Sequence, residues 1–99
     1  MYLGYAQVAA TATVKTDSDF PEPPANATHV ELQATEQNVL YTMDNATSPT
    51  AGATGTGMTL LTTQPPKTFL MEDFRRIRFI RGAGSDGKLN AHYFAGRDT

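Results

Sequence analysis

Apolar and polar side chains alternate along several short runs of this chain. Two runs keep one apolar face over their whole length: Val30, Leu32 and Ala34 in residues 28–35, and Leu89, Ala91 and Tyr93 in residues 88–94. A period of two residues is typical of a β-strand with one buried face. The pattern therefore predicts two strands that each cover a core.

Further short runs rich in Thr, Val, Tyr and Phe lie between clusters of Pro, Gly, Asn and Asp. They predict one or two strands in residues 2–14 and single strands in residues 39–43, 59–63, 68–71 and 76–81, with a possible helical turn at 72–75. Short strands at this spacing favour an all-β fold. We expect a small antiparallel β-sandwich of about seven or eight strands.

Two pairs of these strands are separated by short turn sequences. Glu36, Gln37 and Asn38 separate residues 28–35 from 39–43, and a turn ending in Ser85-Asp86-Gly87 separates residues 76–81 from 88–94. Each pair predicts a hairpin. In residues 76–81 the alternation places Ile77 and Phe79 on one face and Arg76, Arg78 and Ile80 on the other.

The length of 99 residues predicts one domain. Residues 1–27 are expected to form an extended N-terminal strand and a segment rich in proline, since Pro21, Pro23 and Pro24 remove backbone donors. Residues 28–99 are expected to form the sandwich core, with a loop at residues 44–57.

The composition indicates a thin core. Leu, Ile, Val and Phe make up 18 of the 99 residues, below the roughly 20% typical of ordered chains, and the absence of cysteine excludes disulfides. Such a domain usually gains support from a partner or from copies of itself. We expect a homo-oligomer, with a trimer favoured. A net charge of -2 argues against a general nucleic-acid binder, and no apolar stretch is long enough to span a membrane.

Few residues are arranged for catalysis or metal binding. His29 and His92 do not lie in a cluster of the three or four ligands that a metal site needs, and Asp17, Asp19 and Glu22 lack the Gly and closing Glu of a calcium loop. We therefore predict no catalytic residue, no metal site and no cofactor, and a non-enzymatic protein.

Positive charge gathers in one short stretch. Four of the eight Lys and Arg residues are Arg75, Arg76, Arg78 and Arg81. Arginine makes paired hydrogen bonds to carboxylates and phosphates, so this cluster is a candidate contact for a protein partner, with a nucleic acid as a weaker alternative. The other interpretation is a solvated strand face, in which Glu72 and Asp73 pair with the arginines.

The N-terminal segment is a second candidate contact. Tyr2 and Tyr5 lie in a run without charged residues, which could add itself to the sheet edge of a neighbour. The alternative is an ordinary edge strand or a frayed end.

The stretch from Asn38 to Phe94 resembles the small all-β virion proteins of tailed bacteriophages. The matching residues are Val39-Leu40-Tyr41-Thr42-Met43-Asp44, Ser48-Pro49-Thr50, Gly57-Met58, Phe74-Arg75-Arg76-Ile77-Arg78-Phe79-Ile80, Asp86, Leu89 and Tyr93-Phe94. With the upstream strand from His29 to Thr35, the likeness spans about two thirds of the chain. The chain departs from the pattern in its longer loop at Gly52–Gly57 and in the proline-rich segment before His29.

The resemblance implies a structural protein of the virion. The leading hypothesis is a capsid decoration or cement subunit that bridges copies of the major capsid protein on the capsid surface. Assembly would take place in the host cytoplasm. A place in the tail, neck or fibre base is the alternative within the same class. A carbohydrate-binding β-sandwich module is an alternative from another class, and it requires exposed aromatic side chains on one face.

Overall fold

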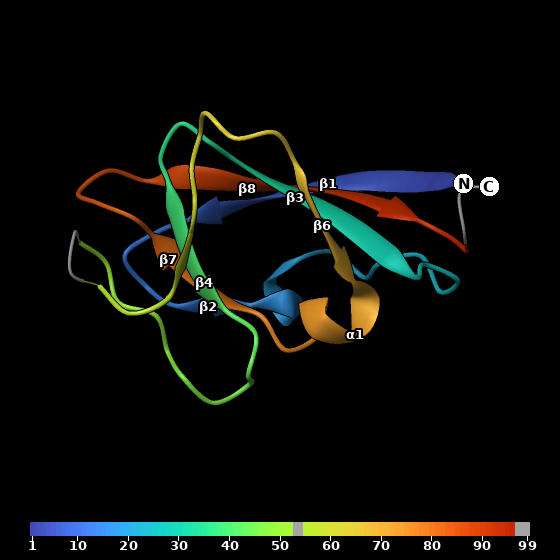
Figure 1. The fold of residues 1–99 in the computed structure, drawn as a ribbon, viewed down its shortest axis with the longest axis horizontal. Helices are drawn as coiled ribbons and strands as arrows, with labels where there is room; N and C mark the ends of the chain where they lie inside the picture. The colour runs from blue at the N-terminus through green and yellow to red at the C-terminus, as the bar shows by residue number, and fades with distance from the viewer. Residues whose placement is uncertain (53–54, 97–99) are drawn as a thin grey trace.

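The computed structural model describes residues 1–52 and 55–96 and contains two four-stranded antiparallel sheets packed face to face (Figure 1). The elements in chain order are β1 (Tyr2–Ala10), β2 (Lys15–Thr16), the 3₁₀ turn η1 (Asp17–Asp19), β3 (His29–Thr35), β4 (Val39–Thr42), β5 (Met58–Leu60), β6 (Lys67–Leu70), α1 (Met71–Phe74), β7 (Arg78–Arg81) and β8 (Gly87–Phe94). The fold is thus the eight-stranded all-β sandwich that the sequence predicts.

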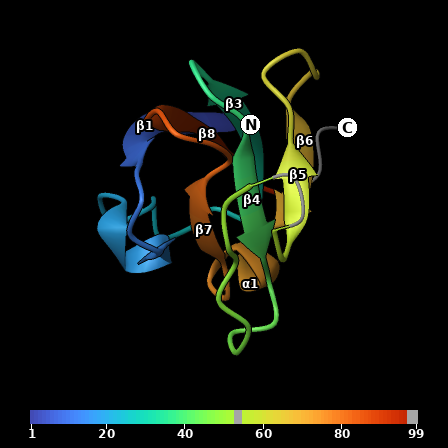
Figure 2. The same ribbon diagram turned by 90° about the vertical axis from the view of Figure 1, so that its left-hand side faces the viewer.

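Four stretches of chain contribute to both sheets, and they follow one another in the same spatial order in each sheet. The first sheet has the order β1-β8-β3-β6 and the second has the order β2-β7-β4-β5. The pairs β1 and β2, β3 and β4, β5 and β6, and β7 and β8 therefore each supply one strand to each sheet. Figure 2 shows β7, β4 and β5 side by side in the second sheet.

This topology corrects both predicted hairpins. β3 pairs with β8 and β6, whereas β4 pairs with β7 and β5, so neither β3 with β4 nor β7 with β8 forms a hairpin. The residues between them turn the chain through a corner from one sheet to the other. The β3–β4 stretch and the β7–β8 stretch pass this corner together and stay paired on both sides of it.

Close backbone contact explains why the two corners lie against each other. Gly82 donates its N–H to the Asn38 carbonyl oxygen at 2.7 Å, and the Gln37 amide donates to the Ser85 hydroxyl at 2.8 Å. A Cβ atom on Gly82 would stand 2.8 Å from that same carbonyl oxygen, and one on Gly87 would stand 2.7 Å from the Gln37 Cβ. Glycine at both positions permits this approach.

The core lies between the sheets and follows the predicted alternation. Val30, Leu32 and Ala34 of β3 are buried, as are Leu89, Ala91 and Tyr93 of β8. Aromatic rings supply much of the remaining packing. The Phe20 ring lies 5.2 Å from Phe74 and 5.8 Å from Phe79, measured between ring centroids, and Phe74 lies 6.1 Å from Tyr93.

The N-terminal segment is part of this packing. Ala6, Val8 and Ala10 of β1 are buried against β8, β2 pairs with β7, and Phe20 lies inside the core. Residues 2–20 therefore belong to the sandwich rather than preceding a core of residues 28–99.

The segment around α1 differs from the predicted boundaries. The predicted helical turn at 72–75 is α1, which buries Met71 and Phe74. Residues 75–77 follow as a turn, so β7 begins at Arg78 instead of residue 76. The expectation that Arg76 and Arg78 share a strand face is therefore wrong.

The outer face of the second sheet carries Leu40 and Ile80, which are paired in register and buried. Leu40 lines a depression together with Gly52, Gly55 and Gly57, and Gly52 donates its N–H to the Gly82 carbonyl oxygen at 3.0 Å. The described part of the predicted loop at 44–57 thus lies over this face, and residues 53–54 fall outside the described residues.

Candidate functional site

The outer face of the first sheet presents three rows of side chains that run across the strands. The register aligns them as Tyr2, Phe94, His29 and Leu70; Tyr5, His92, Glu31 and Thr68; and Gln7, Asn90 and Gln33. The first row is mainly apolar, the last consists of amides, and the middle row is mixed. We refer to these eleven residues, together with a further row of Ala9, Lys88 and Thr35, as the outer face of the first sheet.

Aromatic rings gather at one end of this face. The Tyr2 ring lies 5.2 Å from the His92 ring and 5.8 Å from Phe94, and Tyr5 lies 5.2 Å from His92 on its other side. All three pairs meet edge to face, an arrangement that aromatic quadrupoles favour. Tyr2 and Tyr5 are each 53% exposed, and Leu70 at the end of the first row is 46% exposed. Apolar surface of this kind on one face marks an interaction site more often than scattered apolar residues do.

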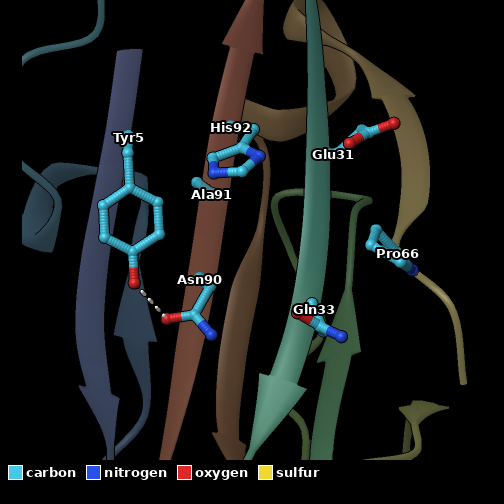
Figure 3. A pocket seen from close by; sticks show the side chains of 7 residues that line it. All are labelled: Tyr5, Glu31, Gln33, Pro66, Asn90, Ala91 and His92. Carbon is cyan, nitrogen blue, oxygen red and sulfur yellow. Dashed lines mark hydrogen bonds between the residues drawn. The ribbon is translucent and has the colours of Figure 1, made fainter.

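A hydrogen-bond network fixes the amide row. Asn90 Oδ1 accepts from the Tyr5 hydroxyl at 2.8 Å (Figure 3). It also accepts from Gln7 Nε2 at 2.7 Å, and Asn90 Nδ2 donates to the Thr35 hydroxyl at 3.3 Å. The Tyr5 ring is therefore held in place before any ligand arrives, which lowers the entropy cost of binding.

A depression of about 240 Å³ lies over the middle of this face. Its lining residues come from all four strands or their ends: Tyr5, Glu31, Gln33, Pro66, Asn90, Ala91 and His92 (Figure 3). Within the described residues, the side chains of Glu31, Gln33 and His92 make no hydrogen bond or ion pair. Their polar atoms remain available to a partner. His92 is exposed and lies opposite Tyr5 on this face.

The arginine cluster is divided between two roles. Arg78 donates to the carbonyl oxygens of Ala46 at 3.0 Å and Asn45 at 3.3 Å and to the Ser48 hydroxyl at 3.2 Å. Arg81 pairs with Asp86 at 2.7 Å. These two guanidinium groups stabilise the loops beside β7.

Arg75 and Arg76 follow α1 and are exposed, with no side-chain hydrogen bond or ion pair among the described residues. The predicted pairing of the arginines with Glu72 and Asp73 is not seen there either. Arg75 lines a separate depression with Asp17, Phe20 and Glu22. The two exposed arginines follow α1 and are not part of the outer face that carries Tyr2 and Tyr5 on β1, so the predicted contacts do not form one patch.

The loop at residues 44–50 is held by Asp44 as well as Arg78. The Asp44 carboxylate accepts from the backbone N–H of Ala46 at 3.0 Å, and from Thr47 through its N–H at 2.8 Å and its hydroxyl at 2.6 Å. These bonds, led by the Thr47 hydroxyl, lower the pKa of Asp44 to about 2. Pro49 is buried next to them.

Sequence reasoning identified Tyr2 and Tyr5 but missed the polar residues beside them. Glu31, Gln33 and Asn90 were on the polar faces of predicted strands, where nothing distinguishes a binding residue from a solvated one. Only the pairing of β8 with both β1 and β3 brings them beside Tyr5.

Comparisons with protein-family models, with curated proteins and with solved structures found no match for this chain. Within the described residues, no helix has the length and apolar character needed to cross a membrane. In the same residues, no three His, Asp or Glu side chains come together in a group that could hold a metal ion.

Proposed function

We propose that this protein is a non-enzymatic structural protein of a phage virion, which binds to the assembled capsid through the outer face of its first sheet. The virion assignment is supported by the sequence resemblance of residues 38–94. The choice of surface is supported by one structural observation, the exposed aromatic end of this face at Tyr2 and Tyr5.

The chemistry of the face suits a protein partner. Tyrosine is enriched at protein interfaces because it offers a large apolar area and one polar atom at low entropy cost. The apolar row of this face supplies contact area at Tyr2 and Leu70, and the amide row supplies hydrogen-bonding groups at Gln33 and Asn90. Many copies on one capsid would add modest contacts by multivalency, which suits a cement subunit that bridges capsid proteins.

Binding to capsids tests this proposal. Purified protein is mixed with capsids of the encoding phage assembled without it, and the bound fraction is measured by sedimentation. We expect saturable binding that falls about tenfold or more in the double variant Tyr2→Ser/Tyr5→Ser. Leu61→Ser is the control, because Leu61 is exposed but lies outside this face. Failure of the native protein to bind, or an equal effect of Leu61→Ser, would contradict the proposal.

A place in the tail, neck or fibre base is the alternative within the virion class. The same aromatic face would then contact a tail or neck protein. Binding to purified tails and not to capsids would favour it.

Saccharide binding is a second candidate function, favoured by the depression beside Tyr5. An ordered aromatic ring in the same depression as the carboxylate of Glu31 and the amide of Gln33 can stack on a sugar ring while these two groups bind its hydroxyl groups. A screen against a glycan array tests this candidate. It predicts binding that is lost in Tyr5→Ser and in Gln33→Ala and kept in Leu61→Ser, whereas the capsid proposal predicts no glycan binding.

A further inference from the structure

The four edge strands of the sandwich differ sharply in length and chemistry. β2 has two residues, β5 has three, and β6 has four and follows Pro65 and Pro66. β1 has nine residues, and residues 2–14 contain no proline and no charged side chain. Natural sheets usually protect an edge by shortening it or by placing proline or charge on it. Three edges here are protected in this way, and β1 is not.

β1 therefore offers a long row of backbone groups for pairing on the side that faces away from β8. In an antiparallel ladder, the N–H and C=O groups of alternate residues point away from the paired strand. At an edge they are available to a further strand. From these observations we infer that β1 pairs antiparallel with β1 of a second copy of this chain, forming a twofold dimer with a continuous eight-stranded sheet.

The sequence of β1 fits pairing with itself. A register centred on Gln7 sets Ala6 opposite Val8 of the second copy, and both are core-facing residues. The same register sets Tyr5 opposite Ala9 of the second copy, so a large side chain meets a small one on the outer face. No like charges meet, because β1 carries none. The charged side chain on β8, Lys88, is paired with Glu36 at 3.0 Å.

The twofold arrangement is favoured over the trimer expected from the sequence. A closed ring of three requires each β1 to pair with a different edge of the next copy. The opposite edge of the first sheet is β6, which has only four residues and follows two prolines. Pairing of β1 with itself needs no second edge. It would also place two outer faces side by side in one particle, which strengthens binding to a repetitive surface.

The oligomeric state of the isolated protein tests this inference without any capsid, so its failure is distinguishable from failure of the proposed function. Analytical ultracentrifugation is applied to the native chain, Gln7→Thr and Gln7→Lys. Both variants lose the amide group through which Gln7 donates to Asn90 and Tyr5. Only Gln7→Lys would place two positive charges opposite each other across the dimer interface. We expect dimers for the native chain and Gln7→Thr, and a dissociation constant raised about tenfold in Gln7→Lys. Thermal unfolding checks that both variants fold.

A single cysteine tests the register, because the native chain has none. Residues opposite each other in an antiparallel pair have Cα atoms roughly 4.5–5.5 Å apart, within the range that a disulfide spans. Gln7→Cys should therefore form a covalent dimer under mild oxidation much faster than Thr68→Cys, which lies on the opposite edge. A monomeric or trimeric native chain, equal dissociation constants for the two Gln7 variants, or equal cross-linking of the two cysteine variants would overturn the inference.

Discussion

The backbone N–H of Gly82 donates to the carbonyl oxygen of Asn38 at 2.7 Å, and this bond joins the two corners at which paired strands leave one sheet for the other. The contact leaves no room for a side chain, since a Cβ atom on Gly82 would lie 2.8 Å from the same oxygen. The stability of the sandwich should therefore depend on this glycine.

Gly82→Ala should lower the free energy of unfolding by about 1–3 kcal/mol, because the added methyl group forces the corners apart. Gly84→Ala is the matched control. Gly84 lies in the same connection, and a Cβ atom at that position would have no neighbour within 4 Å. Urea denaturation of both variants measures the difference, and equal stabilities would contradict the role assigned to the corner.

Arg78→Lys should destabilise the fold by about 1.5–3 kcal/mol, because one ammonium group cannot replace three guanidinium hydrogen bonds to residues 45–48. Arg75→Lys is the control, since the Arg75 side chain makes no such bond within the described residues. Thermal or urea unfolding provides the measurement. A similar small effect for both substitutions would show that Arg78 does not hold the loop.

Acid should weaken the loop at Asp44. Its folded pKa of about 2 lies below the ordinary value of 3.8, so the charged carboxylate contributes stability above pH 4. That contribution is lost as the pH falls from about 4 through about 2. Asp44→Asn should remove this part of the pH dependence, which unfolding curves over that range can measure. An unchanged pH profile in Asp44→Asn would argue against the bonds from Thr47 and Ala46.

Tyr93→Phe should raise the free energy of unfolding by about 1 kcal/mol. The Tyr93 hydroxyl is buried and has no hydrogen-bond partner among the described residues, so its removal ends a desolvation cost. Burial also raises the pKa of Tyr93 above its ordinary value of 10.0, so native stability should fall as the pH rises above 10 and the unfolded chain ionises. Tyr93→Phe should reduce this alkaline loss. A destabilised variant would indicate a role for the hydroxyl.

The local pattern predicted the strands and their buried faces but not their partners. Alternation identified Val30, Leu32 and Leu89 as core residues because burial on one face leaves a period of two in the sequence. The turns at residues 36–38 and 82–87 have the composition of hairpin turns, yet they form corners. The contact between Gly82 and Asn38 holds the two corners together. It joins residues far apart in the sequence, so no local pattern predicts it.

The candidate site could be predicted only in part for the same reason. Tyr2 and Tyr5 were recognisable as aromatic residues on an uncharged segment. Arg78 was indistinguishable in sequence from Arg75 and Arg76, although it holds a loop and they are exposed. Its role depends on carbonyl oxygens of residues 45 and 46, which only the folded chain brings close.

The proposal that this chain belongs to a phage virion is tested most directly by electron cryomicroscopy of virions from a phage whose genome carries its gene. The proposal predicts density for the sandwich at regular positions on the capsid surface, with Tyr2 and Tyr5 against the capsid protein. A particle without this protein, a location confined to the tail or neck, or a sandwich whose outer face of the first sheet points into solvent would contradict it.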